Sequence, residues 1–303
     1  MFKKHAGSFM VVASAAGFAT LAIFIKLAYD AGVNTITILA FRFLLAALIL
    51  WPILKLRNIP FNIKPKTIVQ LCLMGALGYG TMSTFFALSI EHLPVSLAAM
   101  LLYTYPALVT LLSFAVGDEH ITWHKCIALA ICFSGLFLIL GVSFASISTI
   151  GVLLGMGAAV VYSGYIVIGN RVLKNVHPLV ATTYVCSAAA AAFILIGLAK
   201  GSLILTMPVN AWLSLAGIAI LGTIVGILFF FAGLSRIGAA NASIISTAEP
   251  LITVLLSVTL LGDSVSLLQS LGGLLIIAGI IVLQLWNTPA ASPLKTKPGE
   301  AVS

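Results

Sequence analysis

Charged residues are scarce in this chain of 303 residues, in which Asp, Glu, Lys and Arg together make up 7%, against roughly 25% in soluble domains. The apolar fraction is correspondingly large at 61%, and the mean hydropathy is +1.21. A soluble globule of this size could not hide so much apolar surface, because its surface-to-volume ratio leaves a wide polar boundary to fill. The composition therefore excludes a soluble domain and indicates a protein of the lipid bilayer.

Several signatures of chemistry are also missing from the sequence. No basic run with interleaved aromatic residues is present, so the net charge of +8 does not indicate nucleic-acid binding. The four cysteines have no zinc-ligand spacing with a histidine or a second cysteine, and no HExxH motif occurs. No nucleotide-binding loop is present either. We therefore expect no metal, no cofactor and no direct coupling to ATP within this chain.

Long apolar runs are what the sequence has in abundance. A spanning helix needs about 20 mostly apolar residues, and polar or Gly/Pro breaks divide the chain into ten such segments. The first is too long for the apolar core of a signal peptide. The predicted spans are 8–29, 35–54, 67–88, 94–114, 123–142, 150–171, 179–199, 211–234, 239–260 and 266–286. The remaining 287–303 lacks apolar periodicity, and we interpret it as a disordered tail.

The basic residues are distributed unevenly over the predicted loops. If the N-terminus is cytoplasmic, only Lys200 lies on the outer side, whereas the inner side carries Lys3, Lys4, Lys55, Arg57, Lys64, Lys66, Lys125, Arg171, Lys174, Arg236, Lys295 and Lys297. This asymmetry follows the positive-inside rule and requires an even number of spans between the termini. We therefore expect a multi-pass protein of the cell (inner or plasma) membrane with both termini in the cytoplasm.

The chain repeats itself at a constant offset of 144 residues, and we call two residues separated by this offset repeat mates. Matched pairs include Pro106 with Pro250, Gly135 with Gly279, and Phe85-Phe86 with Phe229-Phe230. The repeats cover 8–142 and 150–286 and contain five spans each, so the second must enter the membrane from the opposite face. The predicted fold class is an all-α integral membrane protein with ten transmembrane helices in two inverted five-helix repeats.

Short motifs recur along both halves in a fixed order. They are Leu93 to Ala98, Tyr103 to Pro106 and Gly117 to Glu119 in the first half, and Arg236 to Ala240, Glu249-Pro250, Gly262-Asp263 and Ala278-Gly279 in the second. Together with Lys26 and the Ala40 to Phe43 stretch, they resemble the EamA-type members of the drug/metabolite transporter superfamily. A Trp-Gly pair common in the first helix of that family is replaced by Ala16-Gly17. The resemblance implies a ten-helix transporter of small metabolites, often an exporter.

Ionisable residues within spans are costly, at about 2.5–3.5 kcal/mol each on insertion scales, and three are present. Glu249 lies near the middle of the ninth span beside the helix-breaking Pro250. Its carboxylate could bind a cationic group, exchange a proton, or be held structurally by a lysine or by hydroxyl groups. Arg42 could bind a carboxylate or phosphate, pair with Glu249 or cap a helix. Lys26 could contact a solute, although its position favours an anchoring role at the outer interface.

Tyrosines complete the set of candidate residues. Tyr105 is the repeat mate of Glu249, and Tyr103 would point about 200° away from it on an ideal helix, so at most one is expected to face a cavity squarely. Tyr162 and Asn241 could line a pathway or hydrogen-bond across helices. The candidate substrate-binding or coupling residues are thus Glu249, Arg42, Tyr105, Tyr103, Lys26, Tyr162 and Asn241, with Pro106 and Pro250 as helix breaks. Asp118, Glu119 and Asp263 are expected to cap helix N-termini instead.

These features favour a secondary transporter that moves a small metabolite, such as an amino acid or related amphipathic solute, by alternating access at a midplane site between the repeats. Its partners would be the solute, the lipid bilayer and, if Glu249 exchanges one, a proton; no oligomeric state is predicted. Two alternatives stay open. A membrane-embedded enzyme would need clustered catalytic groups, and Glu249 lacks a second acid within a span. A scaffold would not need an ionisable residue beside a mid-helix proline.

Overall fold

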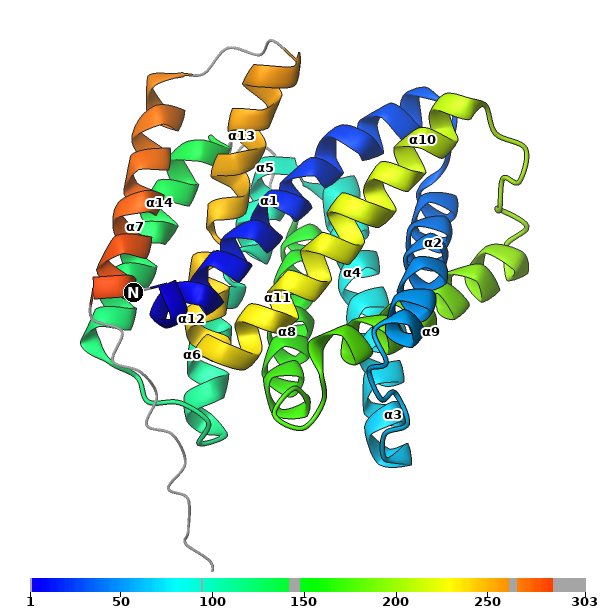
Figure 1. Cartoon of the computed structure of the whole chain (residues 1–303). Helices are drawn as coiled ribbons and strands as arrows, with labels where there is room; N and C mark the ends of the chain where they lie inside the picture. Colours follow the sequence, from blue (N-terminus) through cyan, green and yellow to red (C-terminus); the bar gives the residue numbers. More distant parts are fainter. Residues whose placement is uncertain (1, 94, 142–147, 262–265, 286–303) are drawn as a thin grey trace, which may run out of the picture.

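The computed structural model describes residues 2–93, 95–141, 148–261 and 266–285, and within these ranges it is helical without strands (Figure 1). Two segments, η1 and η2, are π-helical. In chain order the elements are α1 (Phe2–Asp30), α2 (Thr35–Leu56), α3 (Pro65–Leu73), η1 (Met74–Tyr79), α4 (Gly80–His92), α5 (Val95–Leu102), α6 (Tyr105–Ala115), α7 (Trp123–Leu140), α8 (Thr149–Val172), α9 (Pro178–Ala199), α10 (Val209–Gly217), η2 (Ile218–Val225), α11 (Gly226–Ile237), α12 (Ala239–Ile245), α13 (Ala248–Leu261) and α14 (Leu267–Leu285).

Ten helical stretches of the described residues are long and apolar enough to cross a bilayer, as predicted. Four of them are composite, because the third and eighth contain η1 and η2 and the fourth and ninth are broken into α5–α6 and α12–α13. Several helices begin at a polar cap. The side chains of Asn34, Thr122 and Ser148 each accept a hydrogen bond from a backbone N–H in the first turn of the following helix. These caps place the helix starts within a few residues of the predicted boundaries.

The fifth and tenth spans show directly that the two repeats are inverted. The Sγ atom of Cys132 in α7 lies 3.8 Å from the carbonyl oxygen of Ile276 in α14, its own repeat mate. Further along α7, Gly135 packs against Gly272, whereas Gly279 packs against Ala128, further back. Contacts that advance along α7 therefore retreat along α14, so the mates are antiparallel. Because only residues near a symmetry axis contact their own mates, the pseudo-twofold axis passes between these helices.

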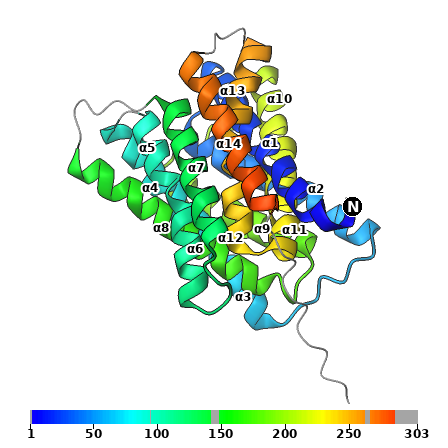
Figure 2. The same ribbon diagram turned by 90° about the vertical axis from the view of Figure 1, so that its left-hand side faces the viewer.

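The second and seventh spans repeat this relation at the other end of the molecule (Figure 1). The indole Nε1 of Trp51 donates to Ser187 Oγ at 3.1 Å, and the rings of Phe43 and Phe193 stack at 6.0 Å. Between the two ends stand two walls, in which α1 packs along α10, η2 and α11, and its counterpart α8 packs along η1 and α4. Figure 2 shows these walls on either side of α7 and α14. The broken spans α5–α6 and α12–α13 lie between them.

The basic residues gather at one end of the bundle. The connections α2–α3, α6–α7, α8–α9 and α11–α12 all lie at the lower end in Figure 1. Basic side chains occupy the last turns of α2, α8 and α11, at Lys55, Arg171 and Arg236, and Arg57 follows α2 directly. We call this end the basic face. The predicted tail, 287–303, lies outside the described residues.

The contact between Gly135 and Gly272 provides a test of the inter-repeat packing. An added Cβ at Gly135 would lie 2.5 Å from the carbonyl oxygen of Gly272, so we expect Gly135→Ala to lower the melting temperature of the detergent-purified protein, since overpacking costs about 1–3 kcal/mol. Gly164→Ala in α8 is the matched control, because its added methyl meets no heavy atom within 4 Å. Equal melting temperatures of the two variants would contradict the close packing of α7 on α14.

Candidate functional site

The two π-helical segments occupy equivalent positions in the repeats. Met74, where η1 begins, is the repeat mate of Ile218, where η2 begins. Within η2 the hydroxyl of Thr223 donates to the carbonyl oxygen of Ile218 at 2.9 Å, which stabilises the wider turn. Tyr79, at the end of η1, is the repeat mate of Thr223. Segments of this kind inside α-helices are frequent at functional sites, so the pair Tyr79 and Thr223 marks a candidate region in the interior.

Arg42 of α2 joins the two π-helical segments. Its Nε donates to Thr223 Oγ1 at 3.0 Å, and its Cζ lies 5.6 Å from the ring centroid of Tyr79 and 4.7 Å from that of Phe43. The residue is only 3% exposed, and its Nη2 has no hydrogen-bond partner among the described residues. Cys186, the repeat mate of Arg42, lies within electrostatic reach of it. Arg42 therefore lies close to the pseudo-twofold axis, where it contacts both repeats.

Glu249 lies where the ninth span is broken. The chain turns at Ser246, whose carbonyl oxygen accepts a hydrogen bond from the backbone N–H of Glu249 at 3.0 Å. Tyr103 and Tyr105 both lie within electrostatic reach of the Glu249 carboxyl group. An ideal helix would not bring both tyrosines to one carboxylate. They converge because α5 ends at Leu102 and α6 begins at Tyr105.

A row of tyrosine rings connects Arg42 with Glu249. Starting at Tyr79 beside Arg42, ring centroids lie 6.4 Å apart to Tyr165, then 5.9 Å to Tyr162, then 4.7 Å to Tyr105. With Tyr103, the row uses five of the seven tyrosines in the chain. The row brings together five of the seven predicted candidate residues: Arg42, Glu249, Tyr103, Tyr105 and Tyr162. Tyr79 was missed, because neither a charge nor a proline marked it; its match to Thr223 in the repeat alignment is the available signal.

The carboxylate of Glu249 has no ion-pair partner in the described part of the chain, where the ion pairs formed are those of Asp118 and Glu119. The lysine that the sequence left open as a structural partner is therefore absent from these residues. Arg42 likewise forms neither the ion pair with Glu249 nor the helix cap that were considered for it. Glu249, Tyr103 and Tyr162 are partly exposed.

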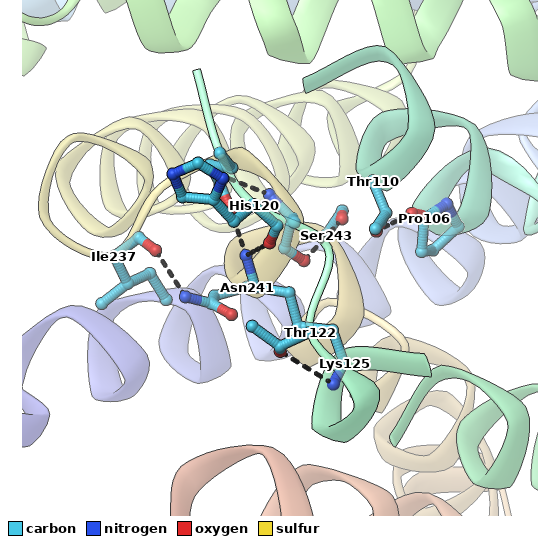
Figure 3. Close-up of polar contacts among 10 residues, drawn as sticks. Pro106, Thr110, His120, Thr122, Lys125, Ile237, Asn241 and Ser243 are labelled. Atoms are coloured by element: carbon cyan, nitrogen blue, oxygen red, sulfur yellow. Dashed lines mark hydrogen bonds and ion pairs between the residues drawn. The ribbon is translucent and has the colours of Figure 1, made fainter. Parts of the chain in front are cut away.

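The other candidates lie elsewhere. Lys26 is exposed in the last two turns of α1, and this end of the helix lies away from the basic face (Figure 1). Asn241 is buried in the first turn of α12, two turns before Glu249, and its Nδ2 donates to the carbonyl oxygen of Ile237 at 2.8 Å (Figure 3). Pro106 and Pro250 stand in the first turns of α6 and α13. These prolines begin new helices, where a missing N–H is tolerated.

A cavity of about 370 Å³ lies apart from the tyrosine row. It is formed by α2, α9, η2 and α11, and its lining is aliphatic except for Arg57 and His177 near the basic face. None of the tyrosines and neither Arg42 nor Glu249 lines it. Its polar groups are too few and too peripheral to make it the candidate site.

At the basic face, a carboxylate of the first repeat holds a helix of the second. Glu119, in the connection α6–α7, accepts a hydrogen bond from the backbone N–H of Ala240 at 3.1 Å and pairs with Lys125 Nζ at 2.6 Å. Gly238, with φ of +81°, makes the tight turn into α12 beside this carboxylate. Figure 3 shows the α6–α7 connection lying against α12 around Asn241. Glu119 thus contacts a helix N-terminus, as expected, and we call this contact the Glu119 latch.

The neighbouring Asp118 does not cap a helix N-terminus, contrary to expectation. It pairs at 2.7 Å with Arg171, in the last turn of α8, and at 3.5 Å with Lys174, just after that helix. Asp118 forms ion pairs instead of capping a helix, because α8 ends beside this connection and two cations lie there. Asp263, for which the same role was expected, lies outside the described residues.

The central broken spans are packed unequally along their length. Every residue of α12, next to the basic face, is buried, and α12 packs against α6. The symmetric contact would be that of α5 with α13, and no comparable contact occurs among their described residues. Beyond Pro250, the described side chains of α13 are all partly or fully exposed. The bundle is therefore closed at the basic face and looser towards the opposite face.

The sequence and the fold are both similar to those of known proteins. The model of the EamA-like transporter family matches residues 5–141 and 149–285. The chain belongs to the EamA-like transporter family. It is 26% identical over 277 residues to the uncharacterized transporter YcbK of Bacillus subtilis, covering 88% of this chain and 89% of that protein. An uncharacterized transporter of Archaeoglobus fulgidus is 26% identical over 276 residues, or 91% and 95% of the two chains.

The fold recurs in a crystal structure with 19% sequence identity and a TM-score of 0.78, covering 92% of this chain and 98% of the other. The resemblance found in the sequence motifs is thus confirmed, as are the all-α fold and its inverted repeats. The EamA-like protein is a multi-pass membrane transporter, and membership of a transporter family indicates a non-enzymatic role. Contact with lipid and with a small-molecule substrate follows from that role.

The Glu119 latch can be tested by hydrogen–deuterium exchange. Loss of a capping carboxylate costs about 1 kcal/mol, so in Glu119→Ala we expect amides of residues 239–245 to exchange about fivefold faster. Asp118→Asn is the control, because its partners Arg171 and Lys174 lie at and just after the end of α8, and exchange in 239–245 should stay at the native rate. Unchanged protection of α12 in Glu119→Ala would show that the latch does not hold this helix.

Proposed function

We propose that this EamA-like protein is a secondary transporter that exports a small metabolite, such as an amino acid or related amphipathic solute, by alternating access at the Arg42–Glu249 row. The observation that carries the proposal is Glu249, a carboxylate without an ion-pair partner among the described residues, beside Tyr103 at the break of the two central spans. Transporters built from inverted repeats bind their solutes at broken helices near the midplane, between the repeats.

Glu249 couples solute binding to the conformation of the broken spans. An ionised carboxylate at this depth is costly unless a cation or a proton balances it. The cationic group of a solute, or a proton, removes that cost on arrival. Because Tyr103 and Tyr105 belong to the first repeat and Glu249 to the second, a change of charge here alters the contact between repeats. Alternating access requires two forms, one open to each side of the membrane, and the contact between the repeats must rearrange when one form changes into the other.

The unequal packing of the central spans corresponds to one of these two forms. The buried α12 and the Glu119 latch close the basic face, and the loose α5 and α13 leave the opposite face open. In the alternative form the repeats exchange roles, so α5, the counterpart of α12, packs closely and α12 is released. The solute then reaches Glu249 from the basic face.

The basic face is assigned to the cytoplasm. Its connections and the helix ends beside them carry most of the described lysines and arginines, as the positive-inside rule requires of cytoplasmic loops. The conformation described above is then open to the exterior, and both termini are cytoplasmic in the cell membrane. Export proceeds by loading at the basic face and release at the opposite one.

Substitution of Glu249 tests the site. In proteoliposomes supplied with a broad metabolite panel, we expect Glu249→Gln to reduce uptake of the transported solute at least about tenfold, the effect of roughly 1.4 kcal/mol, or to abolish its pH dependence. Lys200→Gln is the control, since Lys200 is exposed directly after α9, and it should transport normally. Native-like transport by Glu249→Gln at every pH would remove Glu249 from the mechanism, and wild-type uptake no greater than that of empty liposomes would remove the transporter itself.

The orientation is tested separately with reporter fusions. Green fluorescent protein fused to the C-terminus should fluoresce, and alkaline phosphatase inserted between residues 202 and 207, in the α9–α10 connection, should be active, because the first reporter works in the cytoplasm and the second outside it. Phosphatase inserted at 59–63, in the α2–α3 connection, should be inactive. The reverse pattern would place the basic face outside and overturn the assignment.

A further inference from the structure

We propose that Arg42 forms an anion subsite that binds the carboxylate group of the transported solute, so that the solute is a small organic acid or a zwitterion. The inference rests on the proposed function, since it names the class of solute that the Arg42–Glu249 row accepts. It starts from one atom, Nη2 of Arg42, which is buried and has no hydrogen-bond partner in the described part of the chain. Glu249, at the other end of the row, has a separate role in that function.

A guanidinium group is a planar cation with five hydrogen-bond donors and no acceptor. The rings of Phe43 and Tyr79, at 4.7 and 5.6 Å from Cζ of Arg42, stabilise a cation through their faces but accept no strong hydrogen bond. A buried charged donor without an acceptor is destabilising. A buried donor group without a hydrogen-bond acceptor is rare in folded proteins and needs a specific explanation, such as a ligand that supplies the acceptor. An anion that enters beside Arg42 supplies both the missing acceptor and the balancing charge.

The geometry around Arg42 fits a carboxylate. Thr223 accepts the hydrogen bond from Nε, which fixes the plane of the guanidinium and leaves its Nη edge for a bidentate contact with two oxygens. Among the buried residues that the structure describes, Arg42 is the one that carries a positive charge. A single positive charge balances a carboxylate, whereas a phosphate dianion would remain half neutralised. The charge count therefore favours the monoanion.

The position of Arg42 suits a group that must be reached from both faces. It touches the repeat mates Tyr79 and Thr223 and lies near its own mate Cys186, so it sits at the meeting point of the repeats. From there Tyr165 and Tyr162 lead towards Glu249. Their rings offer an apolar surface for the body of the solute. The carboxylate would thus be held at one end of the row while the rest of the solute lies along the tyrosines.

The test measures binding of defined probe acids to the purified protein in detergent, which needs no transport and does not depend on which solute the protein carries. Isothermal titration and thermal stabilisation are recorded for three acid–amide pairs: isovalerate and isovaleramide, hydrocinnamate and hydrocinnamamide, and leucine and leucinamide. We expect at least one acid to bind about tenfold more tightly than its amide. Arg42→Gln should erase that difference, and Arg42→Lys should retain part of it, because lysine keeps the charge without the bidentate fork. Lys200→Gln, at an exposed position directly after α9, should behave as wild type.

Two further variants keep the outcome decisive. If Arg42→Gln is not monodisperse, Thr223→Val replaces it: releasing Nε should reduce the acid–amide difference, whereas a purely structural effect would weaken both ligands alike. Glu249→Gln should keep the preference for the acid over the amide of the isovalerate and hydrocinnamate pairs. Equal binding of all acids and amides, an undiminished preference in Arg42→Gln, or stronger binding of inorganic phosphate or chloride than of any acid would overturn the carboxylate subsite. Those results would not contradict the proposed transport function, because uptake into liposomes alone tests that function.

Discussion

The architecture depends on the close antiparallel packing of two helix pairs across the pseudo-twofold axis. In lipid, burying an apolar side chain against another helix gains little, so close approach at small residues decides which helices associate. Between α7 and α14 that approach is made by Gly135, Gly272 and Gly279, where an added Cβ would overlap the facing helix. The α2–α9 pair forms the other end through Trp51, Ser187 and stacked phenylalanines. With both ends fixed, the spans between them are free to carry irregular backbone.

Irregular backbone in a membrane protein is tolerated only where its polar groups find partners inside the protein. At the break after α5, the hydroxyl of Thr104 donates to the carbonyl oxygen of Leu101 at 2.6 Å, and after α12 the hydroxyl of Thr247 donates to that of Ile244 at 2.7 Å. Thr223 does the same within η2. These short hydroxyl contacts satisfy carbonyls that a continuous helix would have used. The breaks are therefore stable, and they are also where Glu249 and Tyr103 meet.

Much of the fold follows from the sequence because the bilayer imposes its own length scale. Spans of about 20 apolar residues are visible as runs, and a constant offset between Pro106 and Pro250 exposes the duplication. Glu249 stands out because charge is costly in a span. The π-helical turns escape such reasoning, since one extra residue per turn leaves hydropathy unchanged. The partner of Glu119 could not be predicted either. This partner, Ala240, belongs to the opposite repeat, and only the three-dimensional packing brings it to Glu119.

The chemistry of the site breaks the symmetry that the backbone keeps. Arg42 faces a cysteine as its repeat mate, Glu249 corresponds to Tyr105, and Tyr79 corresponds to Thr223. Two symmetric forms require equivalent scaffolds, but side chains near the axis share one small volume. A second arginine at position 186 would place two like charges together in a medium of low dielectric constant, where their repulsion is strong. Divergence at these positions is thus a physical consequence of lying near the axis, and it gives the site two chemically different ends in which a solute has a single preferred orientation.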